Sequence, residues 1–187
     1  RTGRKLSITG KGRCNLTNNC DIDTLLNNIP QNGKFLYSAL RAFDTKATMS
    51  FFESIGVPLK TERGNRVFPE SDRAFDVVDA LVKKIKTLGI RVSKVKAAGL
   101  IVNEGKISGV KTEQGIIDCN CAIVCTGGLS YPKTGSTGDG YRFAERLGHT
   151  VIPPRPSLVP LESTDDFCSR LQGLSLKNVS LSLWGEK

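Results

Sequence analysis

The sequence predicts an α/β fold with a small antiparallel meander, and three features support this. Apolar residues recur at helical spacing over residues 72–88, and short strand-like segments with tight turns follow over residues 90–119. A glycine-rich loop then joins an apolar run at residues 121–124 to another helical pattern. The 187 residues are enough for one domain with a substantial core, or for one domain and the start of another.

The composition, 39% hydrophobic and 24% charged, is that of a soluble globular protein. No apolar run approaches the ~20 residues of a membrane span, and no signal peptide is evident, so no membrane partner is expected. The six cysteines form no C-x-x-C pair, so no metal site is expected, and their pattern favours a reducing cytoplasm over a secreted, disulfide-bonded protein. The chain begins at Arg1 and its only methionine is Met49, so we expect a fragment of a longer protein. The sequence does not indicate an oligomeric state.

The first half of the chain predicts two helices and a hairpin. Apolar residues recur at helical spacing over residues 33–43 and again over residues 44–54. Residues 57–61 and 66–68 read as two short strands around a turn at residues 62–65.

A third helix follows, and it is the clearest element of the pattern. Ser71 or Asp72 is predicted to cap its start, and Gly89 marks its end. The predicted apolar stripe consists of Phe75, Val78, Leu81 or Val82, Ile85 and Leu88.

The meander is predicted from short strands joined by turns at residues 103–105 and 113–115. The last strand leads through the glycine-rich loop to a helix at residues 138–147. The predicted strands cover residues 90–95, 99–103, 106–112, 116–119 and 122–125.

A proline-rich stretch at residues 153–160 resists helix and suggests a crossover. We therefore expect a first domain at residues 1–152, then a crossover and the start of a second domain at residues 153–187. Apolar alternation in the tail predicts strands of a β-rich domain, at Leu174, Leu176, Val179, Leu181 and Leu183.

The formal charge of +9 raises the question of an anionic partner. Five cations crowd the first thirteen residues, and the first acid is Asp21. A local basic segment with glycines suits a compact anion such as a pyrophosphate, whereas a nucleic-acid groove usually interleaves aromatics, which make up only 6% of this chain. Three further lysines are expected on the solvated face of the third helix: Lys83, Lys84 and Lys86.

Two segments carry the chemistry. "GRKLSITGKGRCNLTN", residues 3–18, gathers glycines, cations and hydroxyls that can converge on an anion. "CTGGLSYPKTGSTGDGY", residues 125–141, places glycines between a strand end and a helix start, where anions bind in doubly wound sheets. Taken separately, each also fits an ordinary surface loop.

Together, with "ERGNRVFPES" between them and "LGHTVIPPRPSLVPL" after them, these segments resemble the bacterial aminoacetone-oxidase-type or BaiN-like FAD-dependent oxidoreductases. The resemblance runs from Gly3 to Val179. It implies a partial FAD/NAD(P)-binding domain of the glutathione-reductase-like type, split by an inserted domain. It also implies that a βαβ unit with G-x-G-x-x-G precedes this segment in the parent protein, and that a closing flavin-binding segment follows it.

The resemblance further implies which residues line the cofactor. The first loop would line the pyrophosphate and adenosine side through Arg4, Lys5, Ser7, Gly10, Gly12, Arg13, Cys14, Asn15 and Thr17. The second would supply the diphosphate turn, Thr126, Gly127 and Gly128, and the flavin side, Tyr131, Pro132, Thr134, Gly135, Ser136, Thr137 and Gly138. Lys11 departs from the family pattern, which has a glycine there, and would be strained if the position needs positive φ.

No catalytic side chain is expected from the sequence. Cys14 beside Arg13 could be nucleophilic, but a structural or flavin-adjacent thiol is favoured because no base partner is evident. The lone His149 is expected to pack or cap. The expected function is two-electron transfer between a small organic substrate and FAD, with NAD(P)H or oxygen as the second partner and no nucleic-acid partner. The alternative is a non-catalytic anion- or nucleic-acid-binding module.

Overall fold

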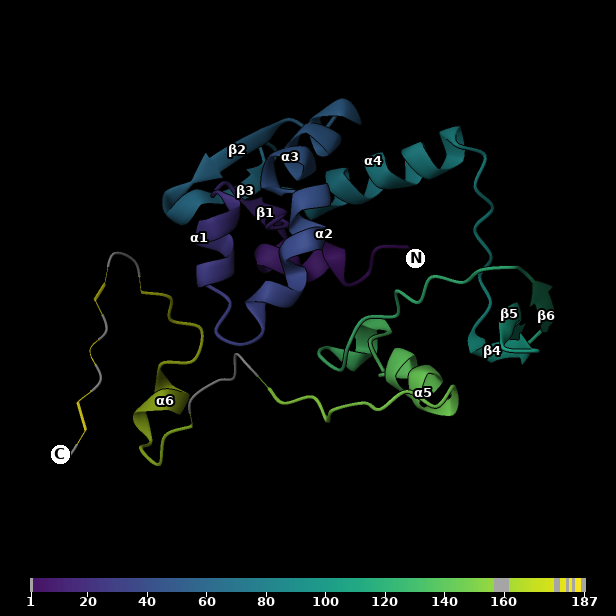
Figure 1. Ribbon diagram of the computed structural model, residues 1–187. Helices are drawn as coiled ribbons and strands as arrows, with labels where there is room; N and C mark the ends of the chain where they lie inside the picture. Colours follow the sequence, from purple (N-terminus) through teal and green to yellow (C-terminus); the bar gives the residue numbers. More distant parts are fainter. Residues whose placement is uncertain (1, 157–161, 177–178, 181, 183, 186–187) are drawn as a thin grey trace. The chain divides into compact units, whose positions relative to one another are not determined.

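The computed structural model describes residues 2–156, 162–176, 179–180, 182 and 184–185. The chain divides into two compact units, residues 1–151 and residues 152–187. Among the described residues, every strand and all helices but one short one belong to the first unit (Figure 1).

The hairpin predicted around residues 62–65 is confirmed. Strands β2 (Leu59–Glu62) and β3 (Arg66–Pro69) pair antiparallel, and the 3-10 turn η3 (Arg63–Asn65) joins them. Strand β1 (Thr17–Asn18), which the sequence pattern did not predict, pairs with the other edge of β3 and gives the order β1-β3-β2. Two residues are too few to show an alternating pattern, so β1 exists because β3 offers it a free edge.

Four short helices lie between β1 and β2: α1 (Ile22–Asn27), η2 (Gly33–Leu36), α2 (Tyr37–Ala42) and α3 (Thr45–Ser54). The helices predicted at residues 33–43 and 44–54 are confirmed, the first as a 3-10 turn followed by an α-helix. Asp44 caps α3, since its carboxylate accepts a hydrogen bond from the N–H of Ala47 at 2.7 Å. Helix α1 was not predicted, because six residues barely reveal a 3.6-residue period.

The third predicted helix is confirmed as α4 (Ala74–Thr87), but its predicted cap is wrong. The N-cap position is Arg73, and no side chain caps the helix. The Asp72 carboxylate instead binds Lys60 and Arg13, and the Ser71 hydroxyl accepts a 3.4 Å hydrogen bond from the N–H of Arg73. Long-range ion pairs therefore replaced the local cap that the sequence offered.

The predicted apolar stripe of α4 faces the core only in part. Val77 and Val78 are buried, whereas Phe75 is 41% and Leu88 is 59% exposed. Helix α4 packs on the first segment and on β3, so the face that begins at Ala74 is the one that turns inward. The core cluster consists of Cys14, Val57, Ala74 and Val77, with Leu6, Leu16, Phe52, Ile55, Leu59, Ala80 and Leu81 packed around it.

The predicted meander is confirmed. Strands β4 (Ala97–Asn103), β5 (Lys106–Thr112) and β6 (Gly115–Asp118) form an antiparallel sheet in that order. Glu104 and Gly105, at the first turn, have φ values of 51° and 76°, as a two-residue hairpin turn requires.

The strands predicted at residues 90–95 and 122–125 are wrong for the described structure, where both segments are irregular. Within the described part of the chain, no backbone hydrogen bond joins residues 121–126 to any other segment. The apolar side chain of Ile123 is also 91% exposed, so no neighbouring element among the described residues covers it. A strand needs a partner for its backbone groups, so the apolar pattern alone did not produce one.

The helix predicted at residues 138–147 is confirmed as α5 (Asp139–Arg146), preceded by the 3-10 turn η4 (Pro132–Thr134). In the second unit, α6 (Phe167–Arg170) is a short helix that the sequence analysis did not predict. The predicted tail strands are absent at Leu174, Leu176 and Val179, which are irregular, and the strand positions predicted at Leu181 and Leu183 lie outside the described residues. Within the residues described, no helix combines the length and apolarity that crossing a membrane requires.

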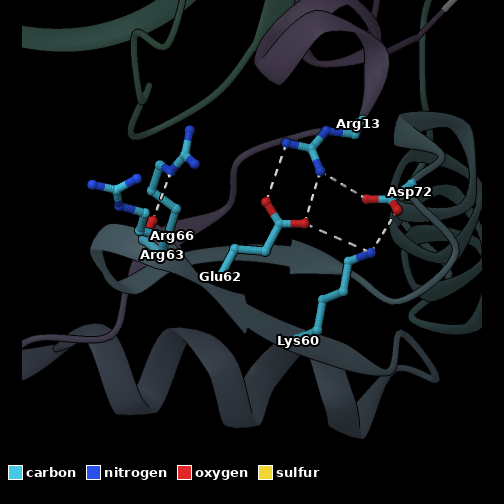
Figure 2. A network of polar contacts seen from close by, with 6 residues as sticks. All are labelled: Arg13, Lys60, Glu62, Arg63, Arg66 and Asp72. Carbon is cyan, nitrogen blue, oxygen red and sulfur yellow. Dashed lines mark hydrogen bonds and ion pairs between the residues drawn. The ribbon is translucent and has the colours of Figure 1, made fainter. Parts of the chain in front are cut away.

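An ion-pair network fastens the first segment to the hairpin (Figure 2). One guanidinium nitrogen of Arg13 lies 2.9 Å from Glu62 and 3.1 Å from Asp72, and the Lys60 ammonium lies 2.5 Å from Asp72. The guanidinium also stands 4.0 Å from the ring centroid of Phe68. These contacts hold the turn that precedes Cys14 against β2 and β3.

We predict that this network makes stability depend on pH. The Arg13 hydrogen bond lowers the pKa of Glu62, and the Lys60 hydrogen bond is the largest cause that lowers the pKa of Asp72. The network therefore stabilises fully above the ordinary carboxyl pKa of ~4, and this stabilisation is lost as pH falls through the lowered values. The urea concentration at the unfolding midpoint should fall between pH ~7 and pH ~3 in the wild type, and it should fall less in Arg13→Met.

The matched control is Arg73→Met, because Arg73 pairs with Asp76 at 3.8 Å outside the network and its side chain is 71% exposed. It should keep the wild-type dependence on pH. An unchanged pH dependence in Arg13→Met would show that the network does not stabilise the fold.

Candidate functional site

The two predicted cofactor segments meet at Lys5. Its ammonium group donates hydrogen bonds to the carbonyl oxygen of Ser130 at 2.7 Å and to the Ser130 hydroxyl at 2.9 Å. It also lies 5.1 Å from the ring centroid of Tyr131. The structure thus brings together residues 125 positions apart in the chain. Ser130 was not among the predicted site residues, because only the contact with Lys5 singles it out.

The first segment is largely folded on itself. The predicted loop is the 3-10 helix η1 (Leu6–Gly12), broken by a kink after Thr9. The Ser7 hydroxyl donates to the carbonyl of Arg4 at 2.8 Å, and the N–H of Cys14 donates to the carbonyl of Thr9 at 3.0 Å. These local bonds give the turn a fixed shape.

Gly10 and Gly12, at the kink, both have positive φ values, but they differ in the space around a Cβ. Gly10 has φ 56°, and a Cβ there would lie 2.8 Å from the backbone N of Asn15, so the turn's own packing requires glycine. Gly12 has φ 85°, and a Cβ there would meet nothing within 4 Å. The open face of Gly12 is therefore accessible to a ligand. Lys11 has φ 58°, which meets the condition under which strain was expected.

Arg13 and Cys14 are not free for a ligand. The Arg13 guanidinium is engaged by Glu62 and Asp72. The Cys14 side chain is 0% exposed in the core, and burial raises the pKa of its thiol more than the Thr9 hydrogen bond lowers it. Cys14 is therefore a buried thiol of the core, which disfavours a nucleophilic role.

The remaining predicted residues of the first segment lie around this turn. Thr17 pairs with Val67 in the sheet. Arg4 and Asn15 are exposed, and Arg4 makes no ion pair within the described residues. Arg4 is thus an available cation next to Lys5.

The second segment is a tightly packed loop at its start. A Cβ on Gly127, which has φ 74°, would lie 2.9 Å from the hydroxyl of Ser136, which is 7% exposed. A Cβ on Gly140 would lie 2.8 Å from the hydroxyl of Thr126. The carbonyl of Gly128 accepts a 3.2 Å hydrogen bond from the N–H of Gly138, at the end of the loop. Internal packing therefore explains most of these glycines.

The accessible part of the second segment surrounds η4. Tyr131 is 66% exposed and has φ 53°, and Pro132 starts the turn. The Thr134 hydroxyl donates to the carbonyl of Tyr131 at 2.7 Å. Gly135 has φ 106° with open space at its Cβ position, so it resembles Gly12 in leaving its backbone approachable.

The start of α5 does not match the expected anion site. Asp139 lies in its first turn, where its carboxylate accepts a 3.0 Å hydrogen bond from the Thr137 hydroxyl and pairs with Arg142. A carboxylate already complements the positive end of the helix, and it would repel a phosphate. Gly138, the N-cap residue, has φ 78°, and a Cβ there would lie 2.7 Å from Leu129, so this glycine is also required by packing.

No acid–base centre emerges from the described part of the chain. His149 is exposed beyond α5 and forms no ion pair there. The described residues contain no cluster of histidine, cysteine and acidic side chains suited to a metal ion. What the site offers is cations, hydroxyls, open backbone and an exposed aromatic ring.

We predict that Lys11→Gly stabilises the protein by about 0.5–1 kcal/mol. Glycine relieves the left-handed strain of about 1–2 kcal/mol, and the greater entropy of its unfolded chain offsets part of this gain. Urea denaturation measures the difference. Lys11→Ala, which removes the charge and keeps the strain, serves as the control and should not gain stability. Equal stability of the glycine and alanine variants would rule out backbone strain at this position.

Comparison with known proteins gives a family match over nearly the whole chain. The model of the HI0933-like protein Rossmann domain matches residues 1–184. The chain is 30% identical to the 3-dehydro-bile acid delta(4,6)-reductase of Clostridium scindens, over 86% of this chain and 38% of that protein.

Two further relatives are ribosomal RNA dihydrouridine synthases. The Haemophilus influenzae protein is 33% identical over 98% of this chain and 47% of its own length, and the Escherichia coli protein is 29% identical over 92% and 42%. The chain thus spans less than half the length of these relatives. Since the family model covers every residue of both candidate segments, the chain belongs to the HI0933-like Rossmann family, the FAD-dependent oxidoreductases of the aminoacetone-oxidase and BaiN type.

Proposed function

We propose that this chain supplies part of the FAD site of a flavoprotein oxidoreductase that moves two electrons between a small organic substrate and flavin. The second redox partner is NAD(P)H or oxygen, and the protein is cytoplasmic. The observation that carries the proposal is the Lys5 contact with Ser130 and Tyr131, which joins the two cofactor-like segments of a Rossmann-family chain.

The accessible groups fit the chemistry of FAD. Lys5 and Arg4 supply positive charge for a diphosphate, and the open backbone at Gly12 and Gly135 lets a ligand approach closely. The exposed ring of Tyr131 offers a stacking surface for an aromatic cofactor. Bound FAD supplies the two-electron transfer, while these residues bind and orient it. Arg13 contributes indirectly, because it holds the first turn on the hairpin.

The sheets of this chain support a cofactor site that is completed elsewhere in the parent protein. A Rossmann fold binds its cofactor at a parallel sheet, yet both sheets among the described residues are antiparallel. Residues 121–125 are apolar and lack a partner strand in the described structure, so they suit a sheet whose other strands belong to the rest of the parent. We therefore expect the isolated 187 residues to bind FAD weakly or not at all.

The names of the relatives support a reaction class. A delta(4,6)-reductase saturates carbon–carbon double bonds, and a dihydrouridine is a uridine in which one ring double bond has been saturated. In both cases the double bond is conjugated with a carbonyl group. We propose that the parent protein likewise reduces a double bond activated by a carbonyl.

A second candidate places that double bond in RNA. It is favoured by two relatives named for ribosomal RNA and by the formal charge of +9 on this chain. It differs from the first candidate in the size and charge of the substrate, and it shares the same cofactor.

We predict that Lys5→Met weakens FAD binding to the full-length protein about tenfold or more. A charge-assisted hydrogen bond contributes about 1.5–3 kcal/mol, and each 1.4 kcal/mol is a factor of ten in affinity. Titration of the apoprotein, followed by flavin fluorescence, measures the change. Lys46→Met, an exposed position on α3, is the matched control and should bind FAD like wild type. Wild-type affinity in Lys5→Met would contradict the proposed site.

The reaction itself is tested with chemically reduced, anaerobic holoprotein. Mixing with a cyclic enone should restore oxidised-flavin absorbance if the substrate is a small molecule, and mixing with a uridine-containing ribosomal RNA stem-loop should restore it if the substrate is RNA. A colourless protein that cannot be reconstituted with FAD would overturn the proposal altogether.

A further inference from the structure

The positive charge of the chain is concentrated in residues 83–112. This stretch contains one acid, Glu104, and eight cations, so it carries a formal charge of +7 out of the +9 of the whole chain. All eight are exposed: Lys83, Lys84, Lys86, Arg91, Lys94, Lys96, Lys106 and Lys111.

None of these cations is neutralised within the described structure. The ion pairs there involve other basic residues, and Glu104, Glu113 and Asp118 pair with none of the eight. The contrast with Arg13 is direct, because the Arg13 guanidinium is held by two carboxylates. Unpaired like charges repel one another and destabilise a compact chain, so their accumulation calls for an anionic partner.

Stabilisation of helix α4 explains only some of the eight exposed cations. Lys84 and Lys86 lie in the last turn of α4, where cations complement the helix dipole. Lys83 also lies in α4, and the other five cations continue beyond the helix, through the irregular segment 91–96 and onto β5 (Figure 1). No helix terminus accounts for these residues.

We propose that residues 83–112, here called the basic stretch, bind the phosphate backbone of RNA. An extended segment spans up to ~3.4 Å per residue, so the six irregular residues alone reach ~20 Å, too far for one compact anion to contact the whole stretch. A polymer of phosphates matches a row of separated cations, and each neutralised phosphate releases a counterion. This inference rests on the second candidate function, because it names the surface that would hold an RNA substrate.

The test uses the full-length holoprotein and a ribosomal RNA stem-loop. The variant Lys94→Gln/Lys96→Gln/Lys111→Gln removes three cations of the basic stretch. Lys34→Gln/Lys46→Gln/Arg170→Gln removes the same charge from exposed positions outside it. At ~0.1 M salt the first variant should bind RNA at least tenfold more weakly. The slope of log affinity against log salt should fall by about 2, since each phosphate that is no longer neutralised lowers it by ~0.7, and the control should stay within about twofold.

Four outcomes would overturn the inference. RNA binding could weaken equally in both variants, weaken in neither, or be absent in the wild type. Alternatively, RNA could fail to displace the protein from phosphatidylserine vesicles. Flavin content and the far-UV circular dichroism spectrum should be unchanged in both variants, which shows that they are folded. RNA binding that fails while the wild-type protein still holds flavin overturns the inference about the basic stretch alone. Absent flavin in wild type with intact RNA binding overturns the proposed function instead.

Discussion

The contact between the Lys5 ammonium and the Ser130–Tyr131 loop is the constraint on which the candidate site depends. It joins a turn at the start of the chain to a loop after the meander, and neither segment alone identifies a cofactor site. The contact requires the first turn to be held in place, which the Arg13 network and the buried Cys14 accomplish from the hairpin and core sides. Charge in this region is therefore divided between residues that fix the fold and residues left available to a ligand.

Elements with long, local patterns could be predicted from the sequence. The period of α4, the turns of the meander and the breakers around β2 and β3 each specify a structure without help from distant residues. The absence of a side-chain cap on α4 could not be predicted, because Asp72 forms ion pairs with the distant residues Lys60 and Arg13 instead of capping the helix. For the same reason, the sequence could single out both candidate segments but not Ser130, nor which glycines serve packing and which leave open backbone.

The strand predictions for residues 90–95 and 122–125 were wrong for a different reason. Their composition is that of strands, yet a strand forms only where another strand satisfies its backbone groups. Both sheets of the described structure are antiparallel, whereas the Rossmann family is built on a parallel sheet. The conflict between pattern and structure at Ile123 fits our proposal that strands outside this chain complete the cofactor site. The relatives are more than twice as long as this chain.

A double-mutant cycle on FAD affinity tests most directly whether the two segments form one site. The variants are Lys5→Met, Tyr131→Leu and their combination, each made in the full-length protein. Because the ammonium lies 5.1 Å from the ring centroid, the two effects should be non-additive, with a coupling energy of at least about 0.5 kcal/mol. Additive effects, within about 0.3 kcal/mol, would show that the segments act independently and would contradict the account.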